Sequence, residues 1–249
     1  MRESGSKPAS QSAVHQKIIF ALDVATLEEA RHFVRLLRGR VGLFKVGLEL
    51  FMAYGPQAVQ VVREAGGDVF LDLKFHDIPN TVSRAAEEAV KLGVPMFNLH
   101  ASGGLEMMQT TAQRCRTLAE KLNRPRPVIL AVTLLTSLNE ENLKEIGWVG
   151  PLSERVAHLA ALAQKAGIDG VVASPREIAA IRRRCSPPFV IVTPGIRPTF
   201  AATEPDDQKR VMTAKEAVAA GADYIVIGRP VRLAPDPAAA MDKVIAEIG

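Results

Sequence analysis

Cysteine, aromatic residues and long apolar runs are all scarce in this chain of 249 residues. The two cysteines, Cys115 and Cys185, form no CxxC pair, which argues against a disulfide framework or a zinc cluster. No apolar run approaches the ~20 residues of a membrane-spanning helix. Aromatic residues make up 5% of the chain and no basic stripe accompanies them, which argues against a nucleic-acid groove. We interpret the basic run RRR at 182–184 as a solvated helix end.

The first sixteen residues, MRESGSKPASQSAVHQ, are polar and lack the apolar centre of a signal peptide. We interpret residues 1–16 as a flexible N-terminal extension and expect residues 17–249 to form one catalytic domain. The expected location is the cytoplasm. The net charge of +4 is mild and compatible with small anionic ligands.

Eight short apolar segments rich in β-branched residues recur along the chain. Segments of this length and composition are typical of fully buried parallel strands. They cover 17–24, 43–50, 68–75, 95–101, 127–135, 170–174, 189–195 and 224–230.

Segments of helical period lie between these strands. Thr26 stands three residues before Glu29, which is the spacing of a capping box. Gly93 and Gly167 follow two other helical segments, as helix-ending glycines do. Pro237 is at the start of the last helical segment, where proline is tolerated.

Eight strand–helix units in about 230 residues predict a single TIM (β/α)8 barrel. The alternative is an open doubly wound sheet, which usually has a glycine-rich first turn. The first turn here, LDVATLEEA, contains no glycine, so we favour the closed barrel. Two long connections, 136–152 and 196–212, would then lie on the catalytic face, where the loops that follow the strands gather.

Charged residues stand where the first three strands end. They are Asp23, Lys45, Asp72 and Lys74, with Asp77 just beyond. Asp72 and Lys74 are two apart on a strand and should face the same side. Taken singly, a lysine at a strand end could form a structural ion pair, and Asp23 could cap a helix. Buried ion pairs add little stability, so four converging charges favour a functional site instead.

Polar residues also follow the later strands, among them Asn98, His100, Thr133, Thr136 and Ser137. The segments TPGIRP and IGRP follow the seventh and eighth strands, where barrels often bind phosphate. Gly228 allows close approach of the backbone to an anion, and Arg229 can bind two phosphate oxygens. His76 could orient Asp77 or the turn that carries it.

Seven segments together resemble one family of phosphate-binding barrels. The spacing D-x-K-x-x-D, in DLKFHDIPNTV, occurs in a small group of such enzymes. With FALDV, FKVGLEL, AVTLLTS, VTPGIRP, DDQKR and IGRPV, the chain resembles the orotidine 5′-monophosphate decarboxylase family, bacterial type. The resemblance covers residues 17–249.

The resemblance implies an activity and a set of site residues. The family removes CO2 from orotidine 5′-monophosphate to give uridine 5′-monophosphate, the last step of de novo pyrimidine synthesis. It uses no metal and no organic cofactor, and it forms homodimers with shared active sites. By this resemblance Lys45, Asp72, Lys74 and Asp77 form the catalytic array, with Lys74 as the proton donor. The implied substrate contacts are Asp23, Lys45, Thr81, Thr136 or Ser137, Pro194, Arg197, Gln208, Gly228 and Arg229.

Two other functions remain open on the sequence. One is a sugar-phosphate decarboxylase or synthase on the same scaffold, which shares D-x-K-x-x-D but requires Mg2+. The other is a catalytically inactive barrel that only binds nucleotides. Neither nucleic acid nor a membrane is an expected partner.

Overall fold

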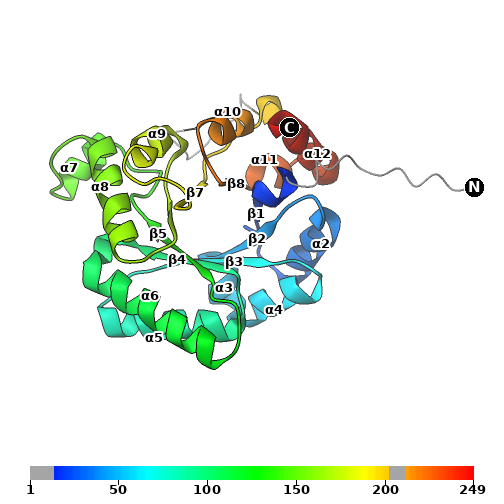
Figure 1. Ribbon diagram of the computed structural model, residues 1–249. Coiled ribbons are helices and arrows are strands. Elements are labelled where there is room, and N and C mark those ends of the chain that lie inside the picture. The colour runs from blue at the N-terminus through cyan, green and yellow to red at the C-terminus, as the bar shows by residue number, and fades with distance from the viewer. Residues whose placement is uncertain (1–13, 202–210) are drawn as a thin grey trace, which may run out of the picture.

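The computed structural model describes residues 14–201 and 211–249. Eight parallel strands close into a barrel in chain order, and β8 pairs with β1 to complete it (Figure 1). The predicted single (β/α)8 barrel is confirmed, and the open doubly wound sheet is wrong. The strands are β1 (Ile18–Ala21), β2 (Leu43–Gly47), β3 (Val69–Phe75), β4 (Met96–His100), β5 (Val128–Val132), β6 (Gly170–Val172), β7 (Val190–Thr193) and β8 (Tyr224–Ile227).

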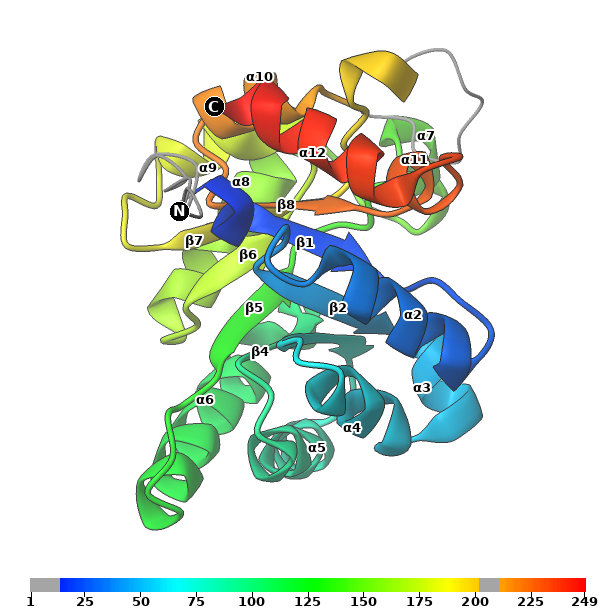
Figure 2. The same ribbon diagram turned by 90° about the vertical axis from the view of Figure 1, so that its right-hand side faces the viewer.

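Helices surround the barrel on its outside (Figures 1 and 2). No helix in the described ranges is both long and apolar enough to cross a bilayer. The helices are α2 (Leu27–Leu37), α3 (Leu48–Tyr54), α4 (Gln57–Glu64), α5 (Pro79–Leu92), α6 (Gly104–Lys121), α7 (Glu140–Glu145), α8 (Leu152–Lys165), α9 (Ile178–Arg182), α10 (Ala214–Ala219), α11 (Arg229–Arg232) and α12 (Pro237–Ile248).

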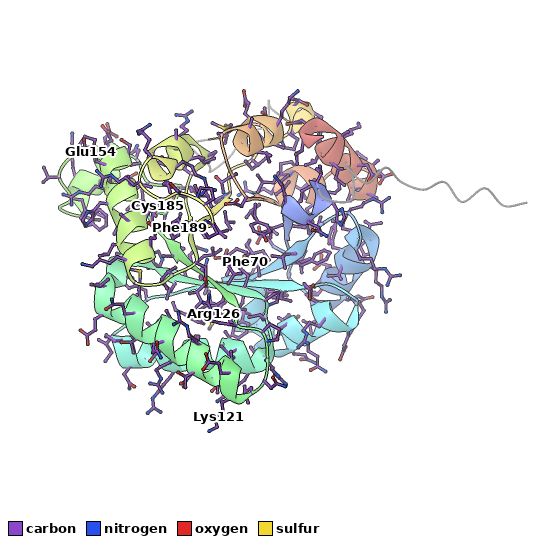
Figure 3. All side chains as sticks on the ribbon, viewed as in Figure 1. Phe70, Lys121, Arg126, Glu154, Cys185 and Phe189 are labelled. Atoms are coloured by element: carbon purple, nitrogen blue, oxygen red, sulfur yellow. The ribbon has the colours of Figure 1, made fainter. Side chains whose placement is uncertain are left out.

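Two apolar cores hold the barrel together. Alternate residues of each strand point outward and pack under the helices, because side chains of a strand alternate between its two faces. The other set fills the barrel interior, where Phe70 lies, whereas Lys121 and Glu154 lie on the outer rim (Figure 3). Burial of each large apolar side chain contributes about 1.5–3 kcal/mol. The interior set is Ile19, Ala21, Leu43, Phe70, Met96, Leu130, Val132, Val172, Val192 and Val226.

The predicted helix signals act at the helix ends. The Thr26 hydroxyl accepts a hydrogen bond from the Glu29 backbone N–H, and the Glu29 carboxylate accepts one from the Thr26 N–H. Gly93 ends α5 in the left-handed conformation, with φ of 70°. Pro237 is the first residue of α12. These local signals therefore set helix boundaries as predicted.

All eight predicted strand segments are longer than the strands observed, and two of them run into an α-helix. The strand expected over 43–50 ends at Gly47, and α3 begins at Leu48. The strand expected over 224–230 ends at Ile227, and α11 begins at Arg229. A short apolar run does not separate strand from helix by itself, and here each run continues past the barrel rim.

The N-terminal extension is only partly described. Residues 1–13 lie outside the described residues. A 3-10 turn, His15–Lys17, leads directly into β1. The backbone of Gln16 packs on Gly42, where an added Cβ would lie 2.4 Å from the Gln16 carbonyl oxygen. Residue 16 is thus in contact with the barrel.

Candidate active site

A cavity of about 360 Å³ opens at the carboxyl ends of the strands. It is lined by residues of β1, β2, β3, β6 and β8, by residues that follow β7 and β8, and by the long connection after β5. The structure thus brings together residues that the sequence places up to 206 positions apart, from Asp23 to Arg229. The predicted site residues in its lining are Asp23, Lys45, Asp72, Lys74, Thr136, Ser137, Pro194, Arg197, Gly228 and Arg229.

Four charges form a continuous chain at one side of this cavity. The Lys45 ammonium lies 3.0 Å from Asp23 Oδ1 and 3.4 Å from Asp72 Oδ2. The Lys74 ammonium lies 2.7 Å from Asp72 Oδ1. Asp72 therefore stands between two cations, and its side chain is only 11% exposed.

This arrangement keeps Lys45 and Asp72, the two most buried of the four groups, in their charged forms. Burial raises the pKa of Asp72, but the ammonium groups of Lys45 and Lys74 and hydrogen bonds from Lys74 and Asn98 outweigh it, so the net pKa is lowered. Burial lowers the pKa of Lys45, but Asp72 and Asp23 outweigh it, so the net pKa is raised. A carboxylate and an ammonium group thus face the cavity at neutral pH.

An irregular end of β3 places Lys74. The pairing of β3 with β4 shifts register between Leu71 and Phe75, and Lys74 has a left-handed backbone with φ of 51°. A left-handed conformation is strained for a residue other than glycine and is most common at functional sites. Asp72 and Lys74 share one cavity as predicted, although the regular pairing of β3 with β4 is interrupted between Leu71 and Phe75.

Asn98 of β4 supports both residues; it was named from the sequence among the polar residues of the later strands, but no role in the site was predicted for it. Its Oδ1 accepts a hydrogen bond of 2.8 Å from the Lys74 backbone N–H, and its Nδ2 donates one of 2.7 Å to Asp72 Oδ1. Asn98 is 1% exposed. The available signal was a fully polar amide in the centre of a buried apolar strand, since such groups are normally hydrogen-bonded.

Two glycines allow the backbone to approach the charges. A Cβ at Gly47 would lie 3.0 Å from Lys45 Nζ. A Cβ at Gly228 would lie 3.2 Å from Ala21 Cβ and 3.5 Å from Asp23 Oδ2. Gly47 was also missed, although a glycine at a strand end beside a functional residue is a recognisable signal.

Among the described residues, two predicted site residues do not line the cavity. Asp77 and Thr81 are exposed at the start of α5, and Asp77 Oδ1 accepts a hydrogen bond of 2.6 Å from the Ile78 N–H. Gln208 lies outside the described residues.

Two histidines pack together beside the array. The rings of His76 and His100 have centroids 5.2 Å apart. The pKa of His100 is lowered to about 4 by burial and by the nearby His76 and Lys74. His100 is therefore neutral at pH 7, and it connects the end of β4 to the turn that precedes Asp77.

The chain is similar to proteins of known sequence over nearly its whole length. Residues 16–244 match the model of the "Orotidine 5'-phosphate decarboxylase / HUMPS family". It is 57% identical over 233 residues to the orotidine 5′-phosphate decarboxylase of Moorella thermoacetica, covering 93% of this chain and 92% of that protein. It is 54% identical over 239 residues to that of Pelobacter propionicus, covering 96% and 98%.

Solved structures agree with these sequence matches. The crystal structure of orotidine 5′-phosphate decarboxylase from Lactobacillus acidophilus has a TM-score of 0.81 and 35% identity, covering 94% of this chain and 99% of that one. That from Pyrococcus horikoshii has a TM-score of 0.73 and 26% identity, covering 93% and 98%. The predicted resemblance is confirmed: this chain belongs to the orotidine 5′-phosphate decarboxylase / HUMPS family.

Proposed function

We propose that this protein is a carboxy-lyase that converts orotidine 5′-monophosphate to uridine 5′-monophosphate and CO2. The observation that carries the proposal is the row of ion pairs that joins Asp23, Lys45, Asp72 and Lys74 at the cavity. The relatives of this chain in the same family are named for this activity. The proposed reaction requires no metal or organic cofactor.

Decarboxylation at C6 requires a fixed positive charge beside the reacting carbon. When the bond between C6 and the carboxylate breaks, CO2 leaves and the electron pair stays in an sp2 orbital of C6 that the ring cannot delocalise. Lys74 would stabilise that charge as an ammonium group and then transfer a proton to C6. Asp72 holds the Lys74 ammonium group in place at 2.7 Å. Solvent would then reprotonate Lys74.

The remaining lining residues suit a nucleotide. Asp23 and Lys45 are proposed to bind the ribose hydroxyls, and Thr136 or Ser137 the pyrimidine. Arg197, Gly228 and Arg229, with Pro194, are proposed to hold the phosphate, supported by their place at the ends of β7 and β8. Gln208 is proposed as a further phosphate ligand. Binding energy from the phosphate, far from C6, would lower the barrier to the chemical step.

We further propose a homodimer in which Asp77 and Thr81 serve the partner's site. Both residues are exposed and neither lines the cavity of its own chain, which supports this assignment. The cytoplasmic location and the flexible extension at 1–16 remain predictions.

The direct test is a spectrophotometric assay with orotidine 5′-monophosphate in excess EDTA. We expect turnover to persist, because the proposed charge stabilisation comes from Lys74 and not from a metal ion. No turnover of orotidine 5′-monophosphate, together with Mg2+-dependent turnover of a sugar phosphate, would favour the sugar-phosphate enzyme alternative. Nucleotide binding without any turnover would favour the inactive barrel.

Mixed subunits test the shared site. Lys74→Ala and Asp77→Ala homodimers should each be nearly inactive. After dissociation and mixing, one of the two sites in each heterodimer would have both residues, so activity should return. No recovery, with heterodimers shown to form, would mean that Asp77 serves its own subunit.

A further inference from the structure

We propose that Arg114 of α6 is a positioning residue for the start of α5, and that through it Asp77 and Thr81 are held for the neighbouring active site. This inference rests on the proposed function, because it assumes that Asp77 and Thr81 act in the partner's site. Arg114 itself lies outside the cavity and outside the D-x-K-x-x-D motif.

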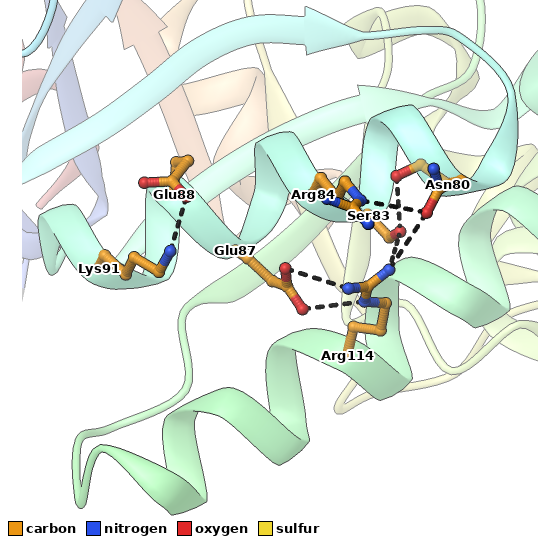
Figure 4. Close-up of polar contacts among 7 residues, drawn as sticks. All are labelled: Asn80, Ser83, Arg84, Glu87, Glu88, Lys91 and Arg114. Atoms are coloured by element: carbon orange, nitrogen blue, oxygen red, sulfur yellow. Dashed lines mark hydrogen bonds and ion pairs between the residues drawn. The ribbon is translucent and has the colours of Figure 1, made fainter.

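The Arg114 guanidinium binds three side chains of α5 (Figure 4). Its Nε and Nη2 donate to the two Glu87 carboxylate oxygens at 2.9 and 3.3 Å. Its Nη1 donates to Ser83 Oγ at 3.3 Å and to Asn80 Oδ1 at 3.5 Å. The planar, always charged guanidinium suits such a fork of contacts, which a lysine cannot reproduce.

The three bound residues mark one stripe of α5. Positions 80, 83 and 87 follow the i, i+3, i+7 spacing of one helix face. Ser83 is fully buried between the helices, and its hydroxyl also donates to the Asn80 carbonyl oxygen at 3.0 Å. Thr81 is exposed and one residue beyond Asn80, so its side chain points about 100° away from the bound face. Holding the stripe therefore sets the rotation of α5 and the direction of Thr81.

The start of α5 depends on such support. Its N-cap residue is Ile78, which makes no side-chain capping hydrogen bond. Asp77 precedes this cap by one residue, and Ile78 is 66% exposed. Helix ends without a side-chain cap fray more readily. The contacts of Arg114 reach the second residue of the helix and replace part of the missing support.

The test uses Arg114→Met, which keeps an unbranched side chain and removes the four hydrogen bonds. The matched control is Lys91→Met, which removes the exposed Lys91–Glu88 pair of 2.7 Å at the far end of the same helix (Figure 4). We expect kcat to fall about tenfold in Arg114→Met and to stay within about twofold in Lys91→Met, because small displacements of aligned groups reduce rates strongly. Arg114→Lys should recover little.

Two heterodimers of equal composition separate positioning from general damage. In the first, one chain carries Lys74→Ala and the other Arg114→Met. Its single competent site combines Lys74 of the second chain with Asp77 and Thr81 of the first, whose Arg114 is intact, so we expect the wild-type rate per site. In the second, both substitutions are on one chain and the other is wild type. Its competent site takes Asp77 and Thr81 from the chain that carries Arg114→Met, so the rate per site should be about tenfold lower.

Each outcome decides between the claims. Equal per-site rates in the two heterodimers would overturn the role of Arg114. The reversed order would support Arg114 as a positioning residue but overturn the shared site of the proposed function. If wild type fails to decarboxylate the substrate, hydrogen exchange still tests Arg114: amides of residues 77–83 should exchange at least about tenfold faster in Arg114→Met than in Lys91→Met. Unchanged exchange would overturn the inference.

Discussion

The two ends of the barrel use ion-paired carboxylates in different ways. At the amino ends of the strands, Asp169 binds Arg126 and accepts a hydrogen bond of 2.8 Å from the Ile129 N–H of β5. Asp223 likewise binds Arg182 at 2.6 Å and the Ile191 N–H of β7 at 2.7 Å. At the carboxyl ends, Asp72 is bound by two lysines and an amide beside an open cavity.

The difference separates structural from functional ion pairs. Each carboxylate at the base joins neighbouring strands through a backbone N–H and is paired with arginine, which binds in a fixed fork. Asp72 is paired with lysines, whose compact charge can be directed at a ligand and whose proton can be transferred. The same ion-pair chemistry therefore links neighbouring strands at one end of the barrel and faces a cavity at the other.

The largest expected effect is at the cavity. Lys74→Ala should lower kcat by at least about 10³-fold, because it removes both the charge that stabilises C6 and the proton donor. Nucleotide binding, measured by calorimetry with uridine 5′-monophosphate, should persist through the phosphate contacts. Near-normal turnover would contradict the assignment of Lys74.

Removing the amide behind the array should have a smaller effect. Asn98→Ala leaves the Lys74 N–H without its acceptor and removes one of the two donors to Asp72 Oδ1, so we expect kcat to fall at least about tenfold and stability to fall by about 1–3 kcal/mol. Steady-state kinetics and thermal unfolding measure the two losses. A wild-type kcat in a folded variant would show that Asn98 has no role in placing Lys74.

The matched substitution at the base should change stability alone. Asp169→Asn weakens the pair with Arg126, so we expect a loss of about 1–3 kcal/mol, or a fall in Tm of several degrees. Values of kcat and KM should be those of the wild type. A catalytic defect as large as that of Asn98→Ala would show that the two ends of the barrel are not separate in function.

The smallest effect concerns pH. Because the pKa of His100 is about 4 in the folded protein and about 6.5 when unfolded, the unfolded chain binds a proton more readily between these values. Stability should therefore fall as pH decreases, by about 1–2 kcal/mol between pH 7 and pH 5. In His100→Asn this part of the decrease should vanish in urea titrations at the two pH values. An equal decrease in both proteins would show that other groups are responsible.

Local sequence patterns were enough for the fold and for the composition of the charged array. Strand length and spacing predict eight strands, and Asp23, Lys45, Asp72 and Lys74 follow from their places at strand ends. The register shift at Lys74 and the contacts of Asn98 depend on how β3 pairs with β4, which one strand's sequence does not encode. For the same reason the interpretation of 182–184 as a solvated helix end is wrong for Arg182, whose partner Asp223 lies 41 residues away.

Closure of the barrel also limits how copies of this protein can meet. Each of the eight described strands is paired on both sides, so within residues 14–201 and 211–249 the sheet offers no row of unpaired N–H and C=O groups to another chain. Association through an added strand is therefore blocked, and so is the commonest route to edge-to-edge aggregation of the folded state. Subunits of the proposed homodimer would recognise one another through side chains on helices and loops. Assembly can thus be altered by surface substitutions that leave every hydrogen bond of the sheet in place.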